Sequence, residues 1–176
     1  MTIWTGEKVM SELGVSPEMV TRWRKTGVLR VAATVGSAKI YKEEDVDRLL
    51  RARQRPLAKD GVPDAWIVRL SDPGYDPKGD PTGRRIGWRE HEPESHIEAA
   101  TRLWRIANPE EQTGKALVVL VGAVIVRVWN ITGGRTDPES GKAIFDVEEP
   151  TKEQEAAYLW RWLELGRGTG LQRWPQ

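Results

Sequence analysis

The sequence contains no cysteine, and its hydrophobic runs are short. The absence of cysteine excludes disulfide frameworks, thiolate metal sites and cysteine nucleophiles, and makes a reducing cytoplasmic compartment the expected one. The longest apolar run, residues 116–126, is about half of the roughly 20 residues that a membrane-spanning helix needs. The first residues show neither the basic start nor the apolar stretch of a signal peptide. We therefore expect a cytoplasmic protein with no membrane partner.

The net charge is also low, since the 176 residues carry a formal charge of only +1. This total hides an uneven distribution. Residues 1–55 hold eleven Lys and Arg against seven Asp and Glu, whereas residues 56–176 hold sixteen against nineteen. The first segment is therefore basic and the remainder is slightly acidic. This division locates a possible nucleic-acid-binding region at the N-terminus.

Phenylalanine and tyrosine are rare, with one and three residues, whereas tryptophan occurs nine times. Tryptophan is thus expected to be the main large packing or stacking residue. Pro56 and the turn-rich residues 59–64 predict a linker. The expected organisation is a first domain over residues 1–55, a linker over 56–64, an α+β domain over 65–166 and a flexible tail over 167–176.

Two short helices joined by a tight turn are predicted near the N-terminus. Thr5 can cap the first helix, which Gly14 ends. Ser16 and Pro17 have the residue types preferred at the start of the second helix, which should end at Gly27. The three residues between these helices give the geometry of a helix-turn-helix.

Strand-like segments 28–31 and 39–41 then flank a turn at residues 36–37, and an acidic stretch opens a third helix near residue 43. Over residues 3–54 the sequence resembles the MerR-like and excisionase-type winged helix-turn-helix domains. The resemblance rests on Leu13-Gly14-Val15-Ser16, Val20-Thr21-Arg22-Trp23, Gly27-Val28-Leu29, Tyr41 and Glu44-Asp45-Val46. It implies binding of double-stranded DNA, with the second helix in the major groove.

Helical spacing turns Val20 and Trp23 inward, so Arg22 is the first candidate for a base contact and Thr21 the second. The resemblance implies that the wing reaches the adjacent backbone or minor groove of the DNA, which makes Arg30 and Lys39 candidate phosphate ligands. The wing departs from the family, which usually has an arginine pair before the tyrosine. The alternative is an ordinary solvated cationic face. The candidate DNA-binding residues are Ser16, Glu18, Thr21, Arg22, Arg24, Lys25, Arg30, Lys39 and Tyr41.

The C-terminal region has the pattern of an α+β domain with an antiparallel sheet. A tight turn at Gly122 should join its two central strands. The pattern around Trp66, Trp88 and Trp129 resembles the small β-barrels of the PUA-like group, some of which bind nucleic acid. Strands are expected over residues 65–70, 117–121, 124–131 and 142–147, helices over 93–106 and 151–165, and loops over 71–87 and 133–141.

No catalytic or metal-binding arrangement is visible in the sequence. His91 and His96 are five residues apart, which does not match the i, i+4 spacing of helical zinc sites. The glycine-rich residues 166–170 follow a helix and do not precede one, unlike a phosphate-binding loop. We therefore expect neither an enzyme nor a bound metal or cofactor.

The leading hypothesis is a sequence-specific DNA-binding protein, acting as a transcriptional regulator. Pro56 interrupts any long dimerisation helix after residue 55, so a homodimer would form through the C-terminal domain. Two alternatives are an excisionase-like factor that bends DNA for recombination and a phage or mobile-element assembly adaptor. An enzyme acting on nucleic acid ranks last.

Overall fold

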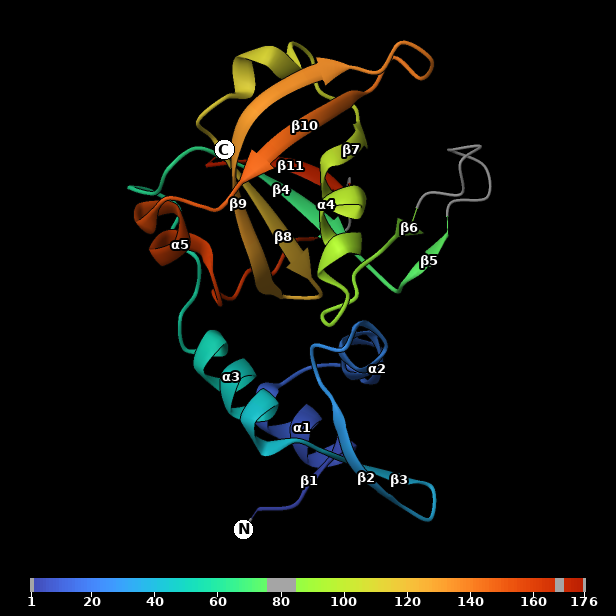
Figure 1. The fold of residues 1–176 in the computed structure, drawn as a ribbon. Coiled ribbons are helices and arrows are strands. Elements are labelled where there is room, and N and C mark those ends of the chain that lie inside the picture. Colours follow the sequence, from blue (N-terminus) through green and yellow to red (C-terminus); the bar gives the residue numbers. More distant parts are fainter. Residues whose placement is uncertain (1, 76–84, 167–169, 176) are drawn as a thin grey trace.

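The computed structural model describes residues 2–75, 85–166 and 170–175. The chain forms a mixed α+β structure with two parts stacked end to end, a smaller N-terminal part and a larger C-terminal part (Figure 1). Within the described residues, no helix is long and apolar enough to cross a membrane.

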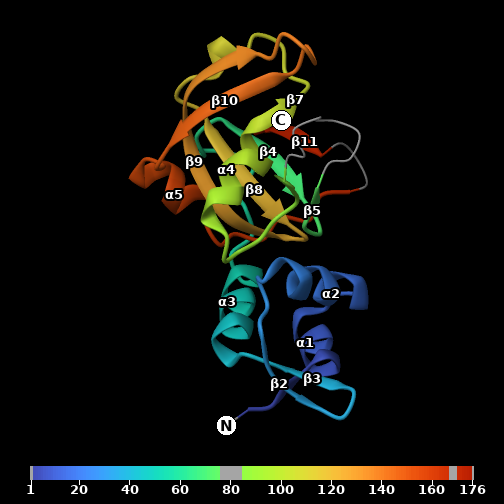
Figure 2. The same cartoon turned by 45° about the vertical axis from the view of Figure 1, so that its right-hand side comes forward.

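The N-terminal part, residues 2–55, contains three helices and a small antiparallel sheet. The hairpin strands β2 and β3 project away from the C-terminal part (Figures 1 and 2). In chain order the elements are β1 (Trp4–Thr5), α1 (Gly6–Leu13), α2 (Pro17–Thr26), β2 (Val31–Val35), β3 (Ala38–Tyr41) and α3 (Glu43–Arg53).

Local sequence signals set the ends of α1 and α2 as predicted. The Thr5 hydroxyl accepts a hydrogen bond from the Lys8 backbone N–H at 3.3 Å, and Ser16 does the same for Met19 at 3.4 Å. Gly14 and Gly27 end the two helices with φ angles of 63° and 80°, which favour glycine. The first hairpin strand begins at Val31, later than predicted, because Val28 and Leu29 are buried in the core before it.

The C-terminal part is built on a six-stranded sheet with the order β11-β4-β8-β9-β10-β7. The strands are β4 (Ala65–Leu70), β7 (Arg102–Trp104), β8 (Ala116–Val121), β9 (Val124–Thr136), β10 (Ala143–Glu148) and β11 (Leu171–Trp174). The expected fully antiparallel sheet is wrong at one pair, because β4 runs parallel to β8. Every residue of β8 is buried, as for a strand covered on both faces.

The predicted hairpin between β8 and β9 is confirmed, with its turn at Gly122 (φ 67°). β9 continues through Gly133 and Gly134, which were expected in a loop. A Cβ on Gly134 would lie 2.2 Å from the Pro109 carbonyl oxygen, in the 3₁₀ helix η1 (Pro109–Gln112). Gly134 therefore permits close packing of β9 against η1 and does not end the strand.

Both C-terminal helices are shorter than predicted. α4 (Pro93–Thr101) gives way to β7, which pairs with β10. α5 (Lys152–Tyr158) starts at the expected capping box of Thr151 and Gln154 but ends seven residues before residue 165. Residues 160–163 instead make backbone hydrogen bonds to β9 and its turn, for example from Leu163 N to Ala123 O at 2.9 Å. Apolar spacing cannot reveal such long-range pairing.

The predicted loop and tail contain further structure. Short strands β5 (Gly74–Tyr75) and β6 (Arg85–Ile86) pair within the expected loop 71–87, of which residues 76–84 lie outside the described residues. The expected flexible tail is wrong over residues 171–174, because β11 pairs with β4 and Trp174 is buried. Residues 167–169 and 176 of that tail lie outside the description.

The segment expected as a linker packs against the C-terminal part at its start. Leu57 is buried, and its N–H donates to the Trp162 carbonyl at 2.8 Å. Tryptophan is the main large packing residue, as expected, and six of the nine are buried. Trp23 of the N-terminal part meets Trp162 of the C-terminal part edge to face, with ring centroids 5.9 Å apart. One hydrophobic core therefore spans both parts of the chain.

Candidate nucleic-acid interface

The inner face of α2 is fixed to the C-terminal part. Trp23 is fully buried, and its indole N–H donates to the Val121 carbonyl at the end of β8 over 3.0 Å. Gly122 follows directly, and a Cβ there would lie 2.3 Å from the Met19 sulfur. The prediction that Trp23 packs in the core is confirmed. The sequence did not show that this core is shared with the β8–β9 turn.

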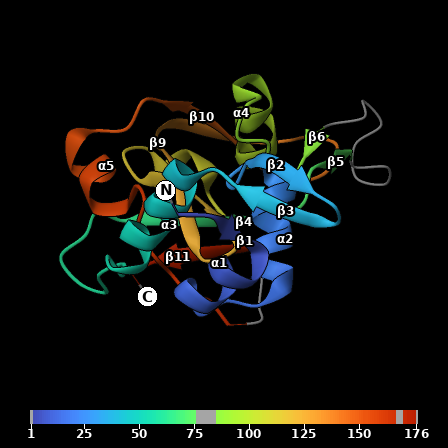
Figure 3. The ribbon, with the colours of Figure 1, turned by 90° about the horizontal axis from the view of Figure 1, so that it is seen from below.

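The outer face of α2 is open to solvent. Glu18, Thr21 and Lys25 are exposed, and Arg22 and Arg24 are partly exposed. The views from the side and from below place α2 and the β2–β3 hairpin on one side of the N-terminal part and α3 on the other (Figures 1 and 3). The two elements that carry the predicted cations, α2 and the hairpin, therefore lie on the same side of the N-terminal part.

Ser16 and Glu18 form a local arrangement at the start of α2. The hydroxyl oxygen of Ser16 caps the helix by accepting the Met19 N–H. A side-chain hydrogen bond from Ser16, helped by the backbone of Glu18, lowers the pKa of Glu18 below its ordinary value. The carboxylate of Glu18 is thus negative near neutral pH, at the positive end of the helix dipole.

Arg30, predicted to contact a phosphate, instead serves an internal ion cluster. Its guanidinium donates to both oxygens of the Asp45 carboxylate, at 2.8 and 2.7 Å, and also contacts Glu44. Burial alone would raise the pKa of Asp45, but the hydrogen bonds and charge of Arg30, with a smaller contribution from Arg48, hold it below the ordinary value. The charge of Arg30 is therefore largely balanced within the protein.

The two wing candidates differ in accessibility. Tyr41 is buried opposite Trp4 in the small sheet, and this burial raises the pKa of its hydroxyl. Tyr41 packs in the hydrophobic core. Lys39 is exposed on β3, across from Thr34. Every residue of β2 is exposed, and none of its side chains is charged. Lys39 is therefore the basic residue of this hairpin.

Several contacts that local sequence patterns did not reveal connect the two parts. Lys25 Nζ forms an ion pair with Asp72 at 2.6 Å. The Glu90 backbone N–H donates to the Thr26 carbonyl at 2.9 Å, at the end of α2. Arg53 of α3 forms an ion pair with Glu164. These partners are far apart in sequence, so only a signal of long-range pairing could have identified them.

The side chain of His96 contacts an aromatic ring and a backbone carbonyl. His96 stacks on Trp88, with ring centroids 3.8 Å apart, and its Nε2 contacts the Arg89 carbonyl oxygen. Burial lowers the pKa of His96, which favours the neutral ring. Within the described ranges, no group of three or more His, Asp or Glu side chains could hold a metal ion.

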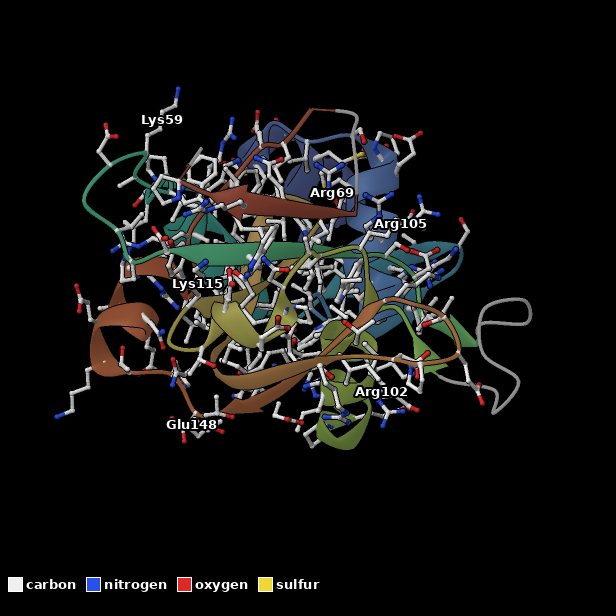
Figure 4. The ribbon with its side chains drawn as sticks, turned by 90° about the horizontal axis from the view of Figure 1, so that it is seen from above. Lys59, Arg69, Arg102, Arg105, Lys115 and Glu148 are labelled. Carbon is white, nitrogen blue, oxygen red and sulfur yellow. The ribbon has the colours of Figure 1, made fainter. Side chains whose placement is uncertain are left out.

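The far end of the C-terminal part also carries basic side chains. Figure 4 views this end and shows its labelled basic side chains spread over different elements. Arg69 donates to the Gly166 carbonyl at 3.1 Å, and Lys115 to the Gln112 side-chain oxygen at 2.7 Å. These cations do not converge on a common point. The basic face of α2 is thus the better-defined candidate interface.

Comparisons with known protein families, with curated proteins and with solved structures each found no match. The resemblances to winged helix-turn-helix and PUA-like proteins remain predictions from sequence.

Proposed function

We propose that the chain is a sequence-specific DNA-binding protein, whose N-terminal part is a winged helix-turn-helix that inserts α2 into the major groove. The observation that carries the proposal is the division of α2 into two faces. One face is anchored in the core through Trp23, while the other presents Thr21 and Arg22 to solvent. A recognition helix needs this combination of fixed position and free polar side chains.

The structure narrows the set of proposed contacts. Arg22 is proposed to bind a guanine edge with two hydrogen bonds, and Thr21 to contact a neighbouring base. Arg24 and Lys39 are proposed to bind phosphates, which fix the position of the protein without specifying sequence. Arg30 and Tyr41 are assigned to supporting the wing, because their side chains are used internally.

The shared core gives the C-terminal part a role beyond that of a tethered domain. Hydrogen bonds and packing at Trp23, Thr26 and Trp162 attach it directly to α2 and to residues preceding the expected linker. Any change of shape there would be transmitted to the proposed recognition helix. We therefore assign the C-terminal part to regulation, through an effector, a partner or a second copy of the chain.

Selection of bound DNA from a random pool, using the whole protein in a gel-shift assay at moderate salt, tests the proposal. The expected result is enrichment of a defined sequence, bound more weakly by Arg22→Ala and normally by Arg51→Ala, which removes an exposed cation from α3. Failure to enrich any sequence would overturn the proposal. Sequence-indifferent, salt-sensitive binding by a large oligomer would instead support the assembly-adaptor alternative, and strong bending of the bound DNA the excisionase-like one.

A further inference from the structure

A second candidate site lies in the C-terminal part, between α4 and β9. It is a pocket of about 430 Å³, and a smaller pocket of about 200 Å³ adjoins it. Glu90, Val126, Arg127 and Glu149 line both, so the two form one continuous cleft. Trp88, His96 and Trp129 line the larger pocket, and Leu159, Trp160 and Glu155 line the smaller one. The walls are therefore aromatic, with carboxylates between them.

The side chains that line this cleft include more carboxylates than cations. Its single arginine, Arg127, is already paired with Glu149 at 2.7 Å and lies 5.3 Å from the centre of the Trp129 ring. The carboxylate of Glu90 accepts one hydrogen bond, from the Trp88 indole N–H at 2.7 Å. None of the described residues forms an ion pair with Glu90. Burial raises the pKa of Glu90, while this hydrogen bond and the nearby charges of Arg48 and His91 oppose the rise.

We propose that this cleft binds a small organic monocation, such as an alkylammonium or arylammonium compound. Its ammonium group would pair with Glu90, and its apolar body would contact the tryptophan walls. A half-buried carboxylate beside aromatic rings is suited to a cation, because the ring faces are electronegative and the Glu90 carboxylate forms no ion pair with a described residue. An anion would face the three carboxylates of Glu90, Glu149 and Glu155. Against them stands the guanidinium of Arg127, whose Nη2 is paired with Glu149 and whose buried Nε has no hydrogen-bond partner.

The same cleft is joined to the proposed recognition helix. The backbone N–H of Glu90 donates to the Thr26 carbonyl in the last turn of α2. A Cβ on the next residue, Gly27, would lie 3.3 Å from the Glu90 Cβ. On the other wall, Arg48 of α3 lies 4.7 Å from the ring centre of Trp160. A cation bound at Glu90 therefore acts as an effector of DNA binding, an inference that rests on the proposed function.

Three probes with the same body test the binding site on the unmodified full chain. They are the cation 2-phenylethylammonium, the neutral 2-phenylethanol and the anion 3-phenylpropanoate. The readout is the NMR signal of the Trp88 indole N–H, assigned with Trp88→Phe. The cation is expected to shift this signal saturably, with the alcohol at least tenfold weaker and the anion without effect. Equal affinity for all three probes, preference for the anion or no binding would overturn the proposal.

A matched pair of variants locates the cation on the carboxylate. Glu90→Gln keeps an oxygen for the Trp88 hydrogen bond but removes the charge, so it should abolish the preference for the cation over the alcohol. Glu139→Gln neutralises an exposed loop carboxylate and should leave it unchanged. If Glu90→Gln still prefers the cation, the assignment of Glu90 is wrong. The three-probe comparison needs no variant and stands if Glu90→Gln fails to fold.

The effector role is tested separately, by titrating the protein with its selected DNA in the presence and absence of the cation. We expect a severalfold change in the midpoint for the wild type and none for Glu90→Gln. A cation that binds without moving the midpoint would overturn the effector role. If the chain binds no DNA at all, the proposed function and the effector role fall together, while the NMR titration still decides whether the site exists.

Discussion

The two faces of α2 show how the same ten residues can serve two purposes. On the inner face, polar groups are paired: the Trp23 indole bonds to Val121, and the Thr26 hydroxyl bonds to the Arg22 carbonyl at 2.8 Å. On the outer face, charged groups meet solvent, and the ion pair of Lys25 with Asp72 is half exposed at each side chain. The inner face therefore determines the position of the helix, and the outer face is where the proposed DNA contacts would form.

The largest effect should come from removing the anchor of the inner face. Trp23→Ala leaves a cavity next to Trp162 and an unpaired Val121 carbonyl, so it should lower the free energy of unfolding by about 3–5 kcal/mol. Urea denaturation followed by circular dichroism measures this loss. Ile3→Ala, at an exposed position, is the control and should change little. A loss below about 1 kcal/mol for Trp23→Ala would contradict the shared core.

The ion cluster that uses Arg30 internally should contribute to stability in a pH-dependent way. The pKa of Asp45 is lowered in the folded chain, so its stabilisation is present above the unfolded pKa of about 4 and is lost as the pH falls through the folded value. Asp45→Asn should cost about 2 kcal/mol at pH 7.

Urea denaturation at pH 7 and at low pH tests this dependence. The difference between Asp45→Asn and the wild type should shrink in acid, whereas Asp47→Asn, a neighbouring carboxylate on α3, should matter little at either pH. A constant difference at both pH values would show that the charge of Asp45 is not the cause.

Two glycines with similar φ angles allow the cost of backbone strain to be separated from the cost of a steric clash. Gly36 in the wing turn has a φ of 59° and nothing within 4 Å of an added Cβ, whereas Gly122 has a φ of 67° and the Met19 sulfur at 2.3 Å. Gly36→Ala should cost about 1 kcal/mol through backbone strain, and Gly122→Ala about 2 kcal/mol because Met19 must also move. Thermal denaturation of both variants checks this; equal losses would mean that α2 tolerates displacement from the turn.

The smallest effect is expected on the outer face. Lys25→Ala removes a solvent-exposed ion pair and should change the unfolding free energy by less than about 1 kcal/mol. High salt should reduce even this difference, because it screens exposed charges. A larger, salt-independent loss in urea denaturation would mean that Lys25 belongs to the anchor between the two parts.

Much of the N-terminal part could be predicted from the sequence, because its signals are local. Thr5, Ser16, Gly14 and Gly27 act on backbone groups within a few residues of themselves. The inward direction of Trp23 also followed from helical spacing, but its partner Val121 lies 98 residues away. Local sequence patterns therefore predicted which residues of α2 point inward and which point outward. They did not show which residues cover the inner face.

The C-terminal part was predicted less well, because long-range pairing overrides its local patterns. The apolar spacing of residues 159–165 suggested a helix, yet Trp160 and Leu163 pair with the backbone of the β8–β9 hairpin. Residues 171–174 resembled a tail but pair with β4. For the candidate site, Arg30 resembled a phosphate ligand because its partner Asp45 lies 15 residues away on another element.

If the outer face of α2 determines DNA sequence preference, as proposed, Arg22→Ala should alter that preference. The measurement is the affinity for the selected DNA site and for its single-base variants, made with the wild type, Arg22→Ala and Lys39→Ala. Arg22→Ala should lose about 1–3 kcal/mol of discrimination at one or two base pairs, with unchanged thermal stability, and Lys39→Ala should weaken all sequences alike. Undiminished discrimination by Arg22→Ala at every base pair would contradict the account.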